Sequence, residues 1–184
     1  MEYNNGRIAV PEMRTGKIIS EDKMKKLIMT LLVFALACLL LVGCMSETYE
    51  PQTFYKGKMS IQLDTSFIEK GSSSYDAKYA SPRIVVYVTE TQFSEFDLPE
   101  VVEELSTKEY AEMLADAYNT TVDQEKGLVT FTREERVSGD NYTFYTVIFK
   151  HSGSFWCIEF ATRSESFAEL KDVIYDYAWS VEFS

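Results

Sequence analysis

The sequence predicts an α+β domain, an antiparallel sheet with helices on both faces (an α/β/α sandwich), preceded by a signal peptide. Three observations support this fold class. Apolar patterns follow the order strands, helix, three strands, helix. The strand predicted at 154–162 is apolar on both faces, so both faces of the sheet need a cover. Only two long helical patterns are present, and we expect one on each side of one sheet.

Charge restricts what the domain binds. The chain has 184 residues, a net charge of −11 and 46% hydrophobic residues. From Cys44 onward, 12 basic residues stand against 25 acidic ones. This balance argues against nucleic acid or an anionic lipid surface as the partner. A domain of this size buries a sufficient core without disulfides or metal.

Residues 24–43 have the layout of an export signal, with a basic start, an apolar run and a small residue before a cysteine. The apolar run Leu27–Val42 has 16 residues, fewer than the ~20 of a membrane-spanning helix. Its end, Leu41, Val42, Gly43 and Cys44, resembles the bacterial lipobox. The resemblance implies cleavage after Gly43 and a lipidated Cys44. The alternative is an uncleaved anchor that happens to end in Gly-Cys.

This resemblance implies a lipoprotein at the extracytoplasmic face of the cell membrane, held there by its lipid. We expect residues 44–53 to be the lipidated cysteine with a polar tether, and 54–184 to be the folded domain. Residues 1–23 reflect either a start codon assigned too early or a long basic segment before the signal.

The three cysteines cannot form a disulfide within the mature chain. Cys38 leaves with the signal and Cys44 carries lipid, so only Cys157 remains. Cys157 lies in an apolar strand pattern, which favours a packed side chain over a reactive thiol.

The first half of the domain is predicted from alternation and turn residues. Met59, Ile61 and Leu63 alternate with polar residues, which predicts a half-buried strand over 58–63. Residues 69–82 contain turn formers without a period and are expected to be a loop. The β-branched run in 83–91 predicts an interior strand.

The second half contains both predicted helices. Ser106 and Glu109 form a capping box ahead of an apolar face made by Tyr110, Met113, Leu114, Ala117 and Tyr118, and Asn119 ends that helix. Strands over 128–136, 142–151 and 154–162 form a meander joined by two hairpin turns. The second helix begins near Ser164 or Ser166 and buries Phe167, Leu170, Ile174, Tyr177 and Ala178.

This element order resembles the PsbP-like superfamily over roughly residues 54–183. The resemblance includes the opening strand 59–63, the hairpins through Phe149 and Phe160, and the closing segment 178–183. It implies the fold alone, because members of this superfamily have unrelated functions.

Few residues point to catalysis. His151 is the single histidine and is expected to be a tolerated polar residue at the sheet margin, and no His or Cys cluster suggests a metal. Nucleophile, phosphate-binding and dinucleotide motifs are missing, so no cofactor is expected. Glu134 and Glu135, between Arg133 and Arg136, are interpreted as a solvated strand end.

An acidic segment before the first helix is the candidate binding site. It consists of Glu95, Phe96, Asp97, Glu100, Glu103 and Glu104. One interpretation is a solubilising surface with carboxylates near a helix N-terminus. The other is a docking loop in which aromatic anchors ringed by charge bind a basic partner. A calcium site is a lesser alternative, because the spacing lacks an EF-hand pattern.

The leading hypothesis is therefore a non-catalytic, membrane-anchored envelope lipoprotein that binds a protein or an envelope component through an acidic surface. A hydrolase that uses paired carboxylates is the second hypothesis. A small solute-binding lipoprotein is the third, and it is disfavoured because the mature chain is short for two lobes.

Overall fold

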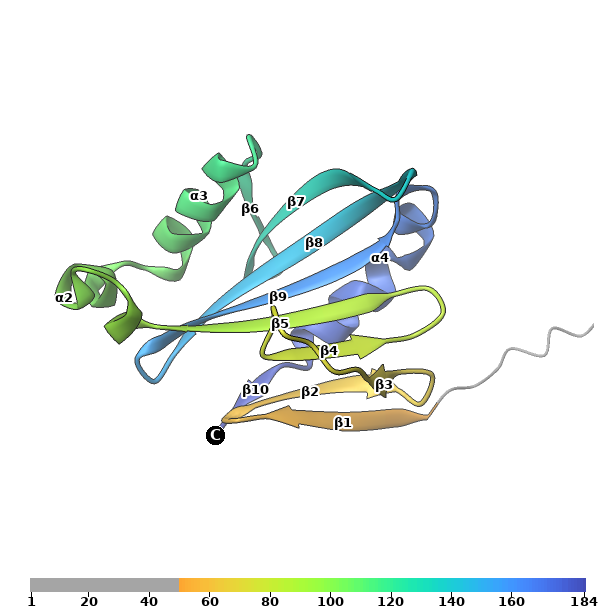
Figure 1. Ribbon diagram of the computed structural model, residues 1–184, viewed down its shortest axis with the longest axis horizontal. Coiled ribbons are helices and arrows are strands. Elements are labelled where there is room, and N and C mark those ends of the chain that lie inside the picture. The colour runs from red at the N-terminus through yellow and green to blue at the C-terminus, as the bar shows by residue number, and fades with distance from the viewer. Residues whose placement is uncertain (1–49) are drawn as a thin grey trace, which may run out of the picture. The chain divides into compact units, whose positions relative to one another are not determined.

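Two antiparallel sheets and the helices packed on them make up residues 50–184, the part of the chain that the computed structural model describes (Figure 1). The predicted export signal, lipobox and lipidated Cys44 lie outside the described residues. Within residues 50–184, no helix has both the length and the apolar character needed to cross a membrane.

The larger sheet has seven strands in the order β3-β4-β5-β9-β8-β7-β6. These strands are β3 (Ile68–Glu69), β4 (Ala77–Ala80), β5 (Val85–Gln92), β6 (Val122–Glu125), β7 (Leu128–Val137), β8 (Asp140–His151) and β9 (Ser154–Arg163). The smaller sheet has the order β1-β2-β10, with β1 (Pro51–Lys56), β2 (Met59–Asp64) and β10 (Glu182–Phe183). The meander β7-β8-β9 and the interior position of β5 confirm the prediction.

The helical segments are the short 3-10 helix η1 (Phe93–Glu95), α2 (Pro99–Glu104), α3 (Thr107–Ala117) and α4 (Ser164–Trp179). The capping box of α3 forms as predicted, since the Ser106 side chain accepts from the Glu109 amide and the Glu109 carboxylate accepts from the Ser106 amide. Helix α4 begins at Ser164 without a side-chain cap.

One face of the seven-stranded sheet packs against α4 and the smaller sheet. Strand residues Val86, Val88, Val147, Trp156 and Ile158 are almost fully buried there. They meet Leu170, Ile174 and Ala178 of α4 and Met59, Ile61 and Leu63 of β2. The predicted inner faces of β2 and α4 are thus confirmed.

The opposite face packs against α2 and α3. Its buried side chains are Phe93, Val102, Tyr110, Ala111, Ala115, Phe131, Ile148 and Phe155. Tyr110 stacks on Phe155 with ring centroids 3.9 Å apart. Helices therefore cover both faces of the large sheet, which confirms the α+β fold class.

The structure differs from the prediction at the start of the domain. A second sheet exists, and β1 begins at Pro51, inside the segment assigned to the tether. The sequence did not reveal β1 because Phe54 is its one buried residue. The strand forms because the edge of β2 offers backbone partners from Met59 to Asp64.

Three further segments were assigned differently. The predicted loop 69–82 contains β4, whose Ala77 and Tyr79 are buried. The stretch after α3 contains β6, which pairs with β7. The acidic segment, expected as a loop, includes η1 and α2, and Pro99 at the first position of α2 suits a helix start.

The buried face of α3 is also rotated from the predicted one. Tyr110, Ala111 and Ala115 are buried, whereas Met113 and Tyr118 remain about half exposed. Stacking of Tyr110 on Phe155 orients the helix, and a pattern within one segment does not contain that contact.

Candidate functional site

The acidic segment lies on the α2 and α3 side of the large sheet. Its five carboxylates, Glu95, Asp97, Glu100, Glu103 and Glu104, are all exposed. Glu95 accepts a hydrogen bond from the Gln92 amide and caps η1. No ion pair involving the other four is formed within residues 50–184.

The aromatic residues of this segment do not project as anchors. Phe93 is buried against Phe155, and Phe96 is half-buried with its ring 6.4 Å from that of Tyr110. The exposed apolar side chains are instead Leu98 and Val101, at 62% and 54% exposure. The docking hypothesis for this segment therefore shifts from Phe96 to these two residues.

A more organised site lies on the part of the large sheet that α2 and α3 leave uncovered. Side chains alternate between faces along a strand, so Glu159 shares the face of Phe155 and Cys157. The pairing register places Lys78, Tyr87, Glu159 and Thr146 in one row across four strands. The next row contains Val85, Ala161, Phe144 and Arg133.

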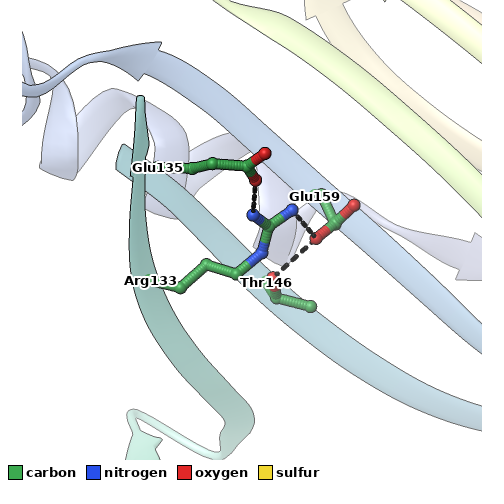
Figure 2. A network of polar contacts seen from close by, with 4 residues as sticks. All are labelled: Arg133, Glu135, Thr146 and Glu159. Atoms are coloured by element: carbon green, nitrogen blue, oxygen red, sulfur yellow. Dashed lines mark hydrogen bonds and ion pairs between the residues drawn. The ribbon is translucent and has the colours of Figure 1, made fainter. Parts of the chain in front are cut away.

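Arg133 joins these rows through a network of polar contacts (Figure 2). Its Nη2 donates to Oε1 of Glu159 over 3.2 Å, and its Nη1 donates to Oε2 of Glu135. The Thr146 hydroxyl donates to the same Glu159 oxygen over 3.3 Å. The guanidinium carbon also lies 3.9 Å from the ring centroid of Phe144 and 4.5 Å from that of Tyr118.

This arginine is held charged although little of it reaches solvent. The Arg133 side chain is 10% exposed and that of Glu159 is 13% exposed. Burial alone lowers the pKa of Arg133, but the charge of Glu159 and the hydrogen bonds to Glu135 and Glu159 outweigh it, so the pKa is raised. Within residues 50–184, its Nε has no hydrogen-bond partner.

Tyrosines from distant segments surround the network. Tyr75, ahead of β4, lies over Tyr87 with ring centroids 4.4 Å apart, and Lys78 Nζ is 5.3 Å from the Tyr87 centroid. Burial, followed by the negative charge of Glu159, raises the pKa of Tyr75. Tyr118 closes the opposite side, at the end of α3.

A hollow of about 390 Å³ lies beside Arg133, between the end of α3 and the part of β7 that β6 does not pair with. Its lining includes Tyr118, Asn119, Thr120 and the β7 residues from Thr132 to Glu135. The site thus combines rigid aromatic rings, a buried ion pair and an adjoining cavity, a composition suited to binding.

The sequence interpretation missed this site, because Arg133 was assigned to a solvated strand end together with Glu134 and Glu135. Glu134 and Glu135 are indeed exposed, but Arg133 is not. One signal was present: Val129, Phe131 and Arg133 alternate onto one face of β7, so an arginine continues an inward-facing row. Its partners Glu159 and Tyr118 come from other segments.

The other chemistry-bearing residues form no reactive centre. Burial raises the pKa of the Cys157 thiol, which keeps it protonated, and its side chain packs against the α3 cluster. His151 stacks on Phe183 of β10 with centroids 4.9 Å apart. Within residues 50–184, no group of three or more potential metal ligands comes together.

Glu135 and Glu159 are the carboxylates that the site brings together, and both bond to Arg133. A general acid–base pair needs groups free to exchange protons with a substrate. Glu135 and Glu159 instead hold the guanidinium of Arg133 in place, which is a structural role.

No protein-family model and no curated protein matches this chain. Among solved structures, it is similar to cyanobacterial PsbP (CyanoP) from Synechocystis sp. PCC 6803, at 16% identity over 78% of this chain and 95% of that one, with a TM-score of 0.48.

Two further structures are similar over 74% of this chain. The Ran-binding protein Mog1p of Saccharomyces cerevisiae is 11% identical, with 96% of its chain covered and a TM-score of 0.46. LpqN of Mycobacterium tuberculosis, described as involved in cell envelope biogenesis, is 10% identical, with 92% covered and a TM-score of 0.42. These identities and TM-scores are low, and nothing about function follows from them.

Proposed function

We propose that this chain is a non-catalytic lipoprotein of the bacterial cell envelope that binds a protein or another envelope component. Lipid on Cys44 would hold it at the extracytoplasmic face of the cell membrane, as the lipobox-like segment Leu41–Cys44 suggests. The observation that most supports a binding role is the group of tyrosines, Tyr75, Tyr87 and Tyr118, around the Arg133–Glu159 ion pair on the large sheet.

This surface has the properties of a preformed binding site. Tyrosine and arginine, the residue types that dominate binding hot spots, lie side by side in it. The buried contacts of Arg133 fix its position before any partner arrives, so little conformational entropy is lost on binding.

The acidic segment supports a basic partner. Its exposed carboxylates lie on the same side of the large sheet as the Arg133 site, because both belong to the face covered in part by α2 and α3. Charges at the rim of an interface act mainly on the rate of encounter. We therefore assign to the acidic segment the electrostatic attraction of the partner, and to the Arg133 site the direct contact with it.

Site-specific photocrosslinking of the full chain in intact cells tests this function. A benzophenone amino acid in place of Tyr87 should capture a partner, whereas the same group at Asp172, exposed on α4, should not. Capture at Tyr87 should be lost when Arg133→Met and Glu159→Met are added together, a pair of changes that removes the site's charges and leaves no uncompensated buried carboxylate. Equal capture at both positions, or none at Tyr87, would contradict the assignment of this face.

The two alternatives fit the geometry less well. A hydrolase with paired carboxylates needs a free acid and base, whereas Glu135 and Glu159 both bond to Arg133. A solute receptor usually surrounds most of its ligand, whereas the hollow beside Arg133 lies open at the sheet edge.

A further inference from the structure

The outer edge of β7 is unpaired over its second half. Strand β6 pairs with β7 only as far as Val122 opposite Phe131, and β7 continues to Val137 (Figure 1). Thr132 therefore begins a stretch whose outer side carries no strand within the described residues. Such an edge presents backbone donors and acceptors that another strand can pair with.

The direction of the free backbone groups follows from two contacts. The Thr120 hydroxyl donates to the Thr132 carbonyl, so the backbone groups of Thr132 point to the outer edge. The turn at Ser138 and Gly139, both with positive φ, is a two-residue hairpin that pairs Val137 with Asp140. The backbone N–H and C=O groups of successive residues point to opposite sides of a strand. The backbone groups of Glu134 and Arg136 therefore also point to the outer edge, and those of Arg133, Glu135 and Val137 point to β8.

We propose that this edge pairs with the same edge of a second copy of the chain, in an antiparallel register centred on Glu135. A two-fold axis at Glu135 places Glu134 of each copy opposite Arg136 of the other, so the interface contains two such pairs. Opposite charges facing each other across paired strands are stabilising, and like charges are destabilising.

Neighbouring registers are less favourable. A centre on Glu134 places the two Glu134 side chains opposite each other. It also places Val137 of the second copy opposite Phe131, the position that Val122 of β6 already occupies. A centre on Arg136 sets the two arginines against each other. With the centre on Glu135, each of the two facing carboxylates already accepts a hydrogen bond from Arg133 of its own copy, which weakens the repulsion between them.

This register also covers an exposed apolar side chain. Val137 is 40% exposed in the single chain. Opposite Arg133, Val137 of the second copy would lie on the α3 face, next to the hollow lined by Tyr118, Asn119 and Thr120. Paired residues on adjacent strands share a face, so the hollow receives this valine. The proposal does not depend on the lipid anchor or on the partner proposed above.

Charge reversal and rescue test the dimer. For the detergent-extracted full chain, light scattering over a concentration series should give a dimer that Glu134→Arg weakens about tenfold, because two attractive pairs become repulsive. Adding Arg136→Glu to Glu134→Arg restores the pairs and should restore the dimer. Asp172→Arg, an exposed reversal on α4, should leave it unchanged. A chain that stays monomeric, or a dimer that Glu134→Arg leaves intact, would overturn the proposal.

Cysteine crosslinking tests the register. The two Glu135 residues would form a pair without mutual hydrogen bonds, with Cα atoms about 4.5 Å apart, within the range of a disulfide. Oxidation should therefore link Glu135→Cys chains into dimers faster than Glu134→Cys chains. Asp172→Cys and the unmodified chain give the background. Faster linking of Glu134→Cys, or background linking of Glu135→Cys, would refute the register.

Discussion

The hydroxyl of Tyr177 on α4 donates a hydrogen bond to the carboxylate of Asp64 at the end of β2. The two residues are 113 positions apart, and their contact fastens the last helix to the smaller sheet. Asp64 also accepts from the Ser66 amide over 2.8 Å. Burial works to raise the pKa of Asp64, but the hydrogen bonds from Ser66 and Tyr177 outweigh it, and the pKa is lowered.

Tyr177→Phe should lower the free energy of unfolding by about 1–2 kcal/mol at neutral pH, because a hydrogen bond to a charged group is lost. A group with a depressed folded pKa stabilises the fold above its unfolded pKa, here 3.8, and the contribution disappears as pH falls through the folded value. Urea unfolding at pH 7, 5 and 3 should therefore show a difference between variant and wild type that shrinks only at pH 3. A difference that stays constant down to pH 3 would show that the hydrogen bond to ionised Asp64 is not its source.

Arg133→Met should destabilise the domain by about 3–5 kcal/mol, because it leaves the Glu159 carboxylate buried without its cation. Adding Glu159→Met should recover most of that loss, since both charges are then removed. Denaturant unfolding of the two variants measures this. Lys58→Met, which removes an exposed cation that has no ion pair within residues 50–184, is the control and should stay within about 0.5 kcal/mol of wild type. Failure of the second substitution to recover stability would argue against a coupled pair.

Neutralising Glu100, Glu103 and Glu104 to Gln should slow association with a captured partner and flatten its salt dependence, because these carboxylates are exposed. Stability should change by no more than about 0.5 kcal/mol. Association rates at several salt concentrations are the measurement. Unchanged rates would leave the acidic segment as a solubilising surface.

Phe96→Ala and Leu98→Ser should separate packing from docking within the acidic segment. Phe96 packs beside Tyr110, so its loss should lower stability by about 2–3 kcal/mol. Leu98 is mostly exposed, so Leu98→Ser should leave stability nearly unchanged. It should weaken partner binding if the acidic segment contacts the partner. Thermal unfolding and binding measured on both variants distinguish the roles, and a large stability loss in Leu98→Ser would contradict the placement of that side chain.

Cys44→Ala should abolish labelling of the chain by a fatty-acid analogue and leave an uncleaved or mislocalised precursor. The physical reason is that the cysteine sulfur is the attachment point implied by the lipobox-like segment. Cys157→Ala, which alters a packed cysteine, is the control and should label normally. Persistent labelling of Cys44→Ala would refute the lipid anchor.

The sequence by itself determined the elements whose pattern is complete within one segment. Alternation in β2, the capping box of α3 and the apolar face of α4 each need only neighbouring residues. The meander was predictable for the same reason, because short turns join strands that are adjacent in the chain. Apolar residues on both faces of β8 and β9 then required covers on both sides, which determined the fold class.

Tertiary structure decided everything that depends on a distant partner. Strand β1 has one buried residue and forms because β2 offers an edge, while α3 is oriented by Phe155 beneath Tyr110. The sequence pattern predicted a solvent-exposed Arg133, whereas contacts with Glu159 and Tyr118 bury its side chain in the structure. Exposure and ion pairing are properties of three-dimensional neighbours, so a pattern of adjacent residues does not contain them.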